Sequence, residues 1–263
     1  MQVRIYAIGM GGIGSFLMAP LSKMVQHGSL NKWRLESLVL VDGDSYTESN
    51  LSRQFFPRAC SGMNKAMAQQ VVLNALAGPE QGARVEAVPS FVLRKNIHTI
   101  LPMPSCFPVI ISMVDNHECR KILSEHCAWW ASRRVPHVLI TGGNRTDDGN
   151  VTVQGFLEGE KMGVDLLERH PEIAISTEGT REGLSCLEIA AMPGGEQTMA
   201  ANMMVAMSIY SVLYSLSTED PQRMDWVRGL QDIYFELSPL RVQPVMAESG
   251  ASGKETDNAM SLD

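Results

Sequence analysis

Cysteine is scarce in this sequence, and no two cysteines have the spacing of a metal site. The five are Cys60, Cys106, Cys119, Cys127 and Cys186, and none forms a C-x-x-C pair. We therefore expect no structural zinc and no disulfide framework. Unpaired thiols in odd number are typical of a reduced compartment, so we expect a cytoplasmic protein.

Basic residues are fewer than acidic ones. The chain has 22 Lys and Arg against 29 Asp and Glu, a formal net charge of −7. A general nucleic-acid binder carries a basic surface, so this class is disfavoured. The acidic balance still permits a local positive pocket.

Long uninterrupted apolar runs are missing as well. The longest, "MAANMMVAMSIYSVLYSL", carries Asn202, Ser208 and Ser211. It predicts a buried helix over about 196–217 rather than a membrane span, and its methionines predict core or dimer-interface packing. The N-terminus enters a strand without a basic segment or a small-residue cleavage site, so we expect no signal peptide and no membrane attachment.

Strand and helix patterns do alternate through the first 143 residues. Short β-branched or apolar runs predict strands at 3–9, 35–44, 83–92, 107–115 and 136–143, and helical periodicity falls at 13–28, 64–77 and 117–134. This alternation predicts an α/β fold, a doubly wound, Rossmann-like and mostly parallel sheet covered on both faces. Ligands of such sheets bind beyond the carboxyl ends of the strands.

The second half of the chain has a different pattern. An antiparallel strand is predicted at 149–159, an irregular crossover at about 160–195, and a further strand at 232–237. We expect one domain over 1–246. The polar, small-residue segment 247–263 predicts a disordered tail.

A glycine-rich turn follows the first predicted strand in "YAIGMGGIGSFLMAP". Gly9, Gly11, Gly12 and Gly14 leave backbone N–H groups at a helix N-terminus open to phosphate oxygens. Asp42 closes the second strand, where an acid can bind ribose hydroxyls. These features alone fit a dehydrogenase as well as an enzyme that cleaves a nucleotide.

The segment "VDGDSYTESNLSRQFFPRACSGMNKA" favours phosphate chemistry. It adds Asp44, Asn50, Arg53, Gln54 and Lys65. Fixed Arg and Lys side chains neutralise the charge that builds on a leaving pyrophosphate, whereas hydride transfer gains nothing from them. In "SMVDNHECR", Asp115 ends the fourth strand and is a candidate Mg²⁺ ligand, with Asn116 and Arg120 beside it.

Together these motifs resemble the adenylation domain shared by ubiquitin-activating enzymes and the ThiF-type activators of sulfur-carrier proteins. The resemblance is carried by "GMGGIGS", "VDGDSYTESNLSRQ", "NKA" and "VDNHECR", and more loosely by "TGGNRTDDGNVTV" and "SCLEIAAMPGGEQTMAANMMVAMSIYSVL". It covers residues 3–217.

The resemblance implies ATP-dependent adenylation of a carboxylate, usually the C-terminal glycine of a ubiquitin-like or sulfur-carrier protein, in a homodimer. By position, Asp42 would bind the ribose, and Asp115 would bind Mg²⁺. Asn50, Arg53 and Gln54 would contact the phosphates, and Lys65 would hold the γ-phosphate, so Arg53, Lys65 and Asp115 would be catalytic. The nucleotide site would comprise Gly9, Gly11, Gly12, Gly14, Asp42, Asp44, Asn50, Arg53, Gln54, Lys65, Asp115 and Asn116.

Two departures from the family pattern matter. Relatives have a helix before the first strand that donates an arginine to the partner's ATP site, whereas only Met1 and Gln2 precede this strand. We expect that cation to come from elsewhere or to be missing. The two C-x-x-C zinc pairs of many relatives are also missing.

Cys186, in the predicted crossover, has two interpretations. Several relatives have a nucleophilic cysteine in a comparable place, which would form a thioester with the activated carboxyl, and Arg181 lies nearby to lower the thiol pKa. Alternatively Cys186 is a small apolar residue. Cys119 and Cys127 are expected to pack against the sheet.

Three rival functions stay open. The enzyme could activate a modified nucleoside in tRNA, which the acidic charge disfavours. The chain could be a catalytically reduced scaffold that binds nucleotide or a ubiquitin-like partner, which the missing arginine helix favours. A dehydrogenase is disfavoured by Arg53 and Lys65.

Overall fold

A central parallel sheet organises the chain, of which the computed structural model describes residues 1–175 and 198–247. Strand β1 (Gln2–Ile8) lies between β3 (Trp33–Val41) and β5 (Phe107–Ser112), parallel to both. On the outer sides, β4 (Arg84–Val88) pairs with β3 and β6 (His137–Asn144) pairs with β5, again in parallel. The predicted Rossmann-like α/β fold is confirmed.

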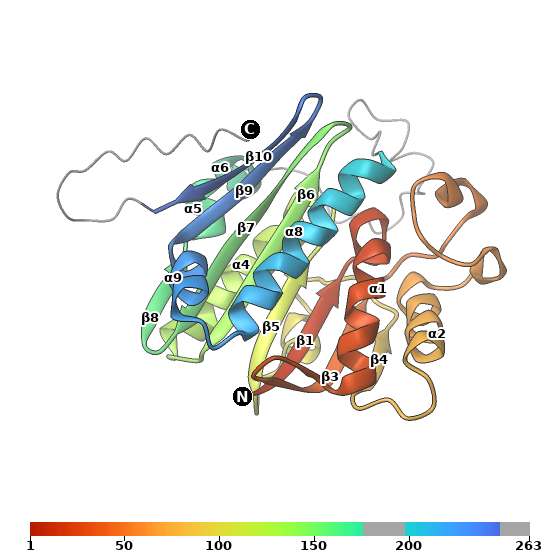
Figure 1. The fold of residues 1–263 in the computed structure, drawn as a ribbon, viewed down its shortest axis with the longest axis horizontal. Coiled ribbons are helices and arrows are strands. Elements are labelled where there is room, and N and C mark those ends of the chain that lie inside the picture. Colours follow the sequence, from red (N-terminus) through yellow and green to blue (C-terminus); the bar gives the residue numbers. More distant parts are fainter. Residues whose placement is uncertain (176–197, 248–263) are drawn as a thin grey trace, which may run out of the picture.

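Helices cover both faces of this sheet (Figure 1). Helices α1 (Gly12–His27), α2 (Lys65–Ala77) and α8 (Met199–Ser217) lie on one face. Helices α3 (Ile97–Ile100) and α4 (His117–Ser132) pack on the other.

Side chains of β1 alternate between two hydrophobic cores. Val3, Ile5 and Ala7 join the core beneath α1 and α8, whereas Tyr6 and Ile8 join the core beneath α4. This follows from the period of two in a strand, and it explains why β1 is apolar along its whole length.

Beyond β6 the sheet continues with antiparallel strands. β7 (Asp148–Leu157) pairs with β6, and β9 (Leu230–Leu237) pairs with the other side of β7. β8 (Glu160–Gly163) also pairs with β7, and β10 (Leu240–Met246) forms the sheet edge beside β9. The full order is β10-β9-β7-β6-β5-β1-β3-β2, where β2 (Ser29–Leu30) is a short antiparallel strand.

Some sequence predictions were wrong in detail. The strand predicted at 83–92 ends at Val88, immediately before Pro89, which has no N–H to continue a ladder. The segment 160–195 is not irregular where the structure describes it, because β8, α5 (Leu166–Arg169) and α6 (Pro171–Ile175) lie within it. Helix α9 (Pro221–Gly229) and strand β10 were not predicted.

Helix α8 is the one described helix long and apolar enough to cross a membrane, and half of that stretch is buried inside the protein. A core helix of a water-soluble protein meets the same criterion. Its methionines are not all core: Met199, Met203 and Met207 are 46%, 46% and 55% exposed. These three residues therefore do not pack in the core, and their packing at a dimer interface stays a prediction.

Candidate nucleotide site

A single large cavity contains most of the predicted site residues. It has a volume of about 930 Å³, within the range of sites for cofactor-sized ligands. It lies at the carboxyl ends of the strands, where the chain order reverses between β1 and β5. This is the position at which doubly wound sheets bind their ligands.

The glycine turn forms one wall of the cavity. Gly9, Gly11 and Gly12 line it, and Gly9 has φ +92°, with the Met113 backbone 2.9 Å from the place a Cβ would occupy. Gly14 does not line the cavity. It lies behind the turn, where a Cβ would approach the Gly9 carbonyl to 2.0 Å. Helix α1 begins at this turn without an acidic residue in its first turn, so its dipole favours an anion in the cavity.

Two acids from the end of β3 hold the neighbouring segments in place. The Asp42 carboxylate accepts hydrogen bonds from the Met10 N–H at 2.6 Å and the Asp44 N–H at 2.8 Å. Burial raises the pKa of Asp42, while the nearby Lys65 charge opposes that rise. Asp44 forms an ion pair of 2.6 Å with the buried Lys65 ammonium. All three side chains line the cavity.

Arg53 and Gln54 line the cavity, whereas Asn50 lies behind them. The fully buried Asn50 accepts the Thr47 N–H at 3.0 Å, which closes the first turn of the 3₁₀ helix Glu48–Ser52. Within the described residues, Asn50 Nδ2 and Gln54 Oε1 are buried without a hydrogen-bond partner. Because such groups are costly, the Gln54 oxygen, which borders the cavity, fits a ligand that donates a hydrogen bond to it.

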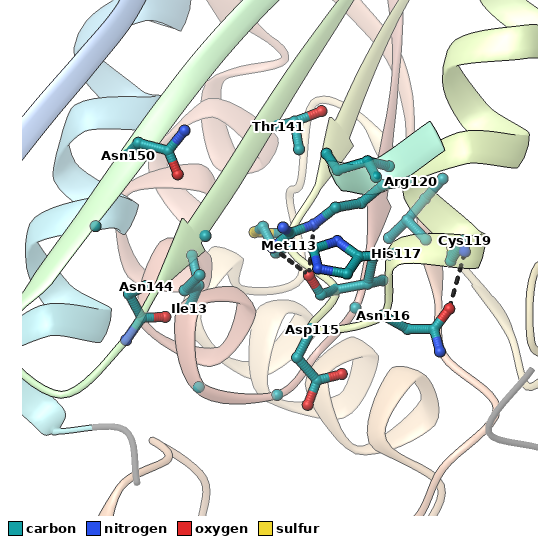
Figure 2. A pocket seen from close by; sticks show the side chains of 18 of the residues that line it. Ile13, Met113, Asp115, Asn116, His117, Cys119, Arg120, Thr141, Asn144 and Asn150 are labelled. Carbon is teal, nitrogen blue, oxygen red and sulfur yellow. Dashed lines mark hydrogen bonds between the residues drawn. The ribbon is translucent and has the colours of Figure 1, made fainter. Parts of the chain in front are cut away.

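The loop after β5 supplies the acid on the opposite wall. Asn116 caps α4, since its side-chain oxygen accepts the Cys119 N–H at 2.9 Å, so Asp115 is not the cap. Asp115 and Asn116 line the cavity (Figure 2). Arg120 donates to the Val114 and Gly142 carbonyls at 2.8 and 3.3 Å and thereby ties this loop to β6.

A magnesium ion fits Asp115 through its donor chemistry. In the described part of the chain, no three His, Cys, Asp or Glu side chains form a metal-binding group. Mg²⁺ bound with a nucleotide needs only one or two carboxylates, because phosphates and water complete its shell. Asp115 supplies one carboxylate at the cavity wall.

Sequence reasoning missed part of the lining near Asp42. The chain after β4 passes the mouth of the cavity with Ser90, Phe91, Val92 and Leu93, and Phe91 packs on Gly43. An apolar wall beside Asp42, the predicted ribose-binding acid, suits a nucleobase. We missed this turn because we predicted a strand over 83–92. Pro89, which cannot continue a strand ladder, is the residue that indicates the turn.

A second missed group lines the cavity on its β7 side. Asn150 and Thr152 of β7, His170 between α5 and α6, and Tyr234 of β9 face the cavity there. Figure 2 shows Asn150 and Asn144 across the pocket from Asp115. We call this group the β7 side, and the glycine turn with Asp42, Arg53, Lys65 and Asp115 the β1 side.

A fully buried carboxylate, Asp232, organises the β7 side. It accepts hydrogen bonds from Arg169 Nε at 2.5 Å and Thr152 Oγ1 at 2.5 Å, and it pairs with His170 Nε2 at 3.2 Å. The other ring nitrogen of His170 lies 3.0 Å from Glu172. Burial opposes ionisation of Asp232, but the bonds from His170, Thr152 and Arg169 lower its pKa to about 2. The bond to Asp232 raises the pKa of His170.

Of the described cysteines, Cys60 and Cys127 are buried, whereas Cys106 and Cys119 are partly buried. Cys186 and Arg181 lie outside the described residues, so the thioester stays a prediction. Cys119 and Cys127 pack in the core beneath α4, as predicted, and burial raises the pKa of Cys119 to about 12. Cys60 packs in a small cluster with Tyr46 and Phe56.

Comparisons with known proteins agree with the fold. The model of the ThiF family matches residues 1–209, and no curated protein sequence matches. E. coli MccB crystallised with AMPCPP and MccA has a TM-score of 0.64 and 14% identity, and E. coli MccB with ATP has 0.62 and 14%. PaaA has a TM-score of 0.59 and 16% identity.

These matches cover 93–94% of this chain and 64–65% of the solved chains, so the chain spans slightly less than two thirds of their length. The structural likeness shows the shared fold. The family model covers more than three quarters of the sequence. The chain belongs to the ThiF family.

Proposed function

We propose that this protein binds ATP with Mg²⁺ and adenylates the C-terminal carboxylate of a small protein or peptide. The observation that carries the proposal is the convergence of Arg53, Lys65 and Asp115 on one cavity beside the α1 N-terminus. Membership of the ThiF family and the MccB structures with ATP and MccA support it.

In this reaction the substrate carboxylate attacks the α-phosphorus of ATP, and the bond from that phosphorus to the β-phosphate bridging oxygen breaks. An acyl-adenylate and pyrophosphate result. Arg53 and Lys65 neutralise the charge that develops on the leaving pyrophosphate. Lys65 pairs with Asp44 and also borders the cavity, where its ammonium can approach a phosphate. Mg²⁺ on Asp115 would neutralise further phosphate charge.

The test is exchange of labelled pyrophosphate into ATP, provoked by small proteins and peptides that end in Gly-Gly. We expect exchange with wild type and a loss of at least about 100-fold in Asp115→Asn, the size typical of a lost transition-state charge contact. Asp225→Asn, on the exposed outer side of α9, is the matched control. Equal exchange in Asp115→Asn and wild type would contradict the proposal. ATP binding without exchange for any carboxylate would favour the scaffold alternative.

The finer steps also belong to this proposal. The substrate is a ubiquitin-like or sulfur-carrier protein with a C-terminal glycine. The Cys186 thiolate attacks the carbonyl carbon of the acyl-adenylate, which gives a thioester and releases AMP. A reductant-sensitive adduct that is lost in Cys186→Ala supports the thioester step. An adduct that survives the substitution removes Cys186 from the mechanism.

We further propose a homodimer built on α8. The 19-residue helix has no charged residue, and Met199, Met203, Met207 and Tyr214 are 39–55% exposed on its outer face. Exposed apolar surfaces of this kind mark protein interfaces. Sedimentation should give a dimer for wild type and a monomer for Met203→Glu with Met207→Glu, and a wild-type monomer at micromolar concentration would contradict the proposal.

A further inference from the structure

Tyr46 is a buried polar residue at the centre of the nucleotide motif whose hydroxyl the proposed chemistry does not use. It is 1% exposed, and its ring stacks on Phe56 with centroids 3.9 Å apart and planes 8° apart. Phenylalanine could supply the same stacking without a buried hydroxyl, which costs free energy unless it is hydrogen-bonded.

The Tyr46 hydroxyl makes two hydrogen bonds inside the protein. It donates to the carbonyl of Met10, in the glycine turn, at 2.6 Å. It accepts from Gln69 Nε2 at 2.7 Å. Gln69 is fully buried and lies on α2 one turn after Lys65, so the two side chains share a helix face.

Gln69 reaches a third segment as well. Its Nε2 also donates to the Phe55 carbonyl at 3.0 Å, directly after Arg53 and Gln54. The Phe55 N–H in turn donates to Ser15 Oγ of α1 at 2.9 Å. The pair therefore connects the glycine turn, the segment that carries Arg53 and the helix that carries Lys65.

We infer that the Tyr46–Gln69 pair is a positioning device that holds the phosphate-binding groups at fixed separations. Neither side chain lines the cavity, so both act through Met10, the Arg53 segment and Lys65. Phosphoryl and adenylyl transfer depend on such alignment, because small displacements of the binding groups cost large factors in rate. This inference rests on the proposed ATP site.

A purely structural role predicts lost stability with unchanged ATP affinity of the folded protein, so measuring both quantities separates the two roles. Tyr46→Phe leaves the Met10 carbonyl and one Gln69 bond unpaired, which destabilises the fold. Adding Gln69→Met also takes the donor from the Phe55 carbonyl, so the double variant releases both segments that the pair holds. Tyr6→Phe, a buried tyrosine in the core beneath α4, is the matched control.

The experiment measures ATP affinity by calorimetry and unfolding by urea for wild type and the three variants. We expect Tyr46→Phe to lower ATP affinity about tenfold, equivalent to about 1.4 kcal/mol. We expect the double variant, which releases both carbonyls, to bind ATP at least as weakly as Tyr46→Phe, and Tyr6→Phe to keep wild-type affinity.

Two results would overturn the inference alone: wild-type ATP affinity in Tyr46→Phe, or wild-type ATP affinity in the double variant. A wild-type protein that binds no ATP would overturn the proposed function and this inference with it. The first two results leave the proposed function intact, so the two failures are distinguishable.

Discussion

The two sides of the cavity are built in different ways. On the β1 side, the ligand-facing groups come from short motifs that follow consecutive strands, and Arg53, Lys65 and Asp115 lie within one contiguous third of the chain. On the β7 side, Asp232 contacts Thr152 and Arg169 across 80 and 63 positions of sequence. The first side has a recognisable pattern because a local backbone turn creates it, whereas the second is created by antiparallel strand pairing.

The charges of the two sides also differ in use. On the β7 side, the fully buried Asp232 is compensated by Arg169 and by His170, which itself lines the cavity. On the β1 side, Lys65 pairs with Asp44, and the dipole of α1 together with the cations Arg53 and Lys65 at the cavity wall attracts an anion. We therefore expect substitutions on the β7 side to act mainly on stability, and those on the β1 side mainly on ATP-dependent activity.

The largest effect should come from Asp232→Ala. Removing the carboxylate leaves Arg169 and His170 without their shared partner, and breaking a buried ion pair costs about 3–5 kcal/mol of unfolding free energy. Urea denaturation measures the loss, with Asp225→Ala as the exposed control. If Asp232→Ala loses no more free energy of unfolding than Asp225→Ala, Asp232 does not organise the β7 side.

Lys65→Met should have the next largest effect, on activity. We expect pyrophosphate exchange to fall about 100-fold or more, because a positioned cation on the leaving group is lost. The exposed Lys161 of β8 provides the control variant Lys161→Met. If both variants exchange equally well, the cation at 65 plays no part in the chemistry.

A smaller effect concerns the pH dependence of the His170–Asp232 pair. Because the pKa of His170 is raised above 6.5, its contribution to stability is complete below about pH 6.5 and is lost as the pH rises through the raised value. Asp232, with a pKa lowered to about 2, loses its contribution only as the pH falls from about 4 towards 2. We expect His170→Gln to cost about 1 kcal/mol at pH 6. Urea titrations should show that this cost shrinks by pH 9, and a constant cost would contradict the assignment.

Much of the fold follows from local sequence rules. The strands and helices of the parallel half were predictable because β1, β3 and β5 are apolar on both faces and alternate with amphipathic helices. The position of the cavity was predictable too, since every motif follows the end of a strand. Asn50 and Gly14 belong to the predicted motifs, but they support the cavity wall and do not line the cavity.

The rest depends on contacts between distant residues. Nothing near Asp232 in sequence indicates that it will accept bonds from Thr152 and Arg169, because the pairing of β7 with β9 brings them together. Strand β10 is mostly exposed and contains Pro244, so it lacks the apolar pattern of a strand. The Tyr46–Gln69 bond likewise depends on how α2 folds back over the loop after β3.

The central claim is that a triphosphate lies on the β1 side of the cavity against Lys65. An ATP derivative with a lysine-reactive acyl group on its γ-phosphate tests this claim most directly, with labelled peptides identified by mass spectrometry. We predict that labelling concentrates on Lys65 and is suppressed by excess MgATP. Labelling spread over exposed lysines such as Lys23 and Lys161, without protection by MgATP, would contradict the account.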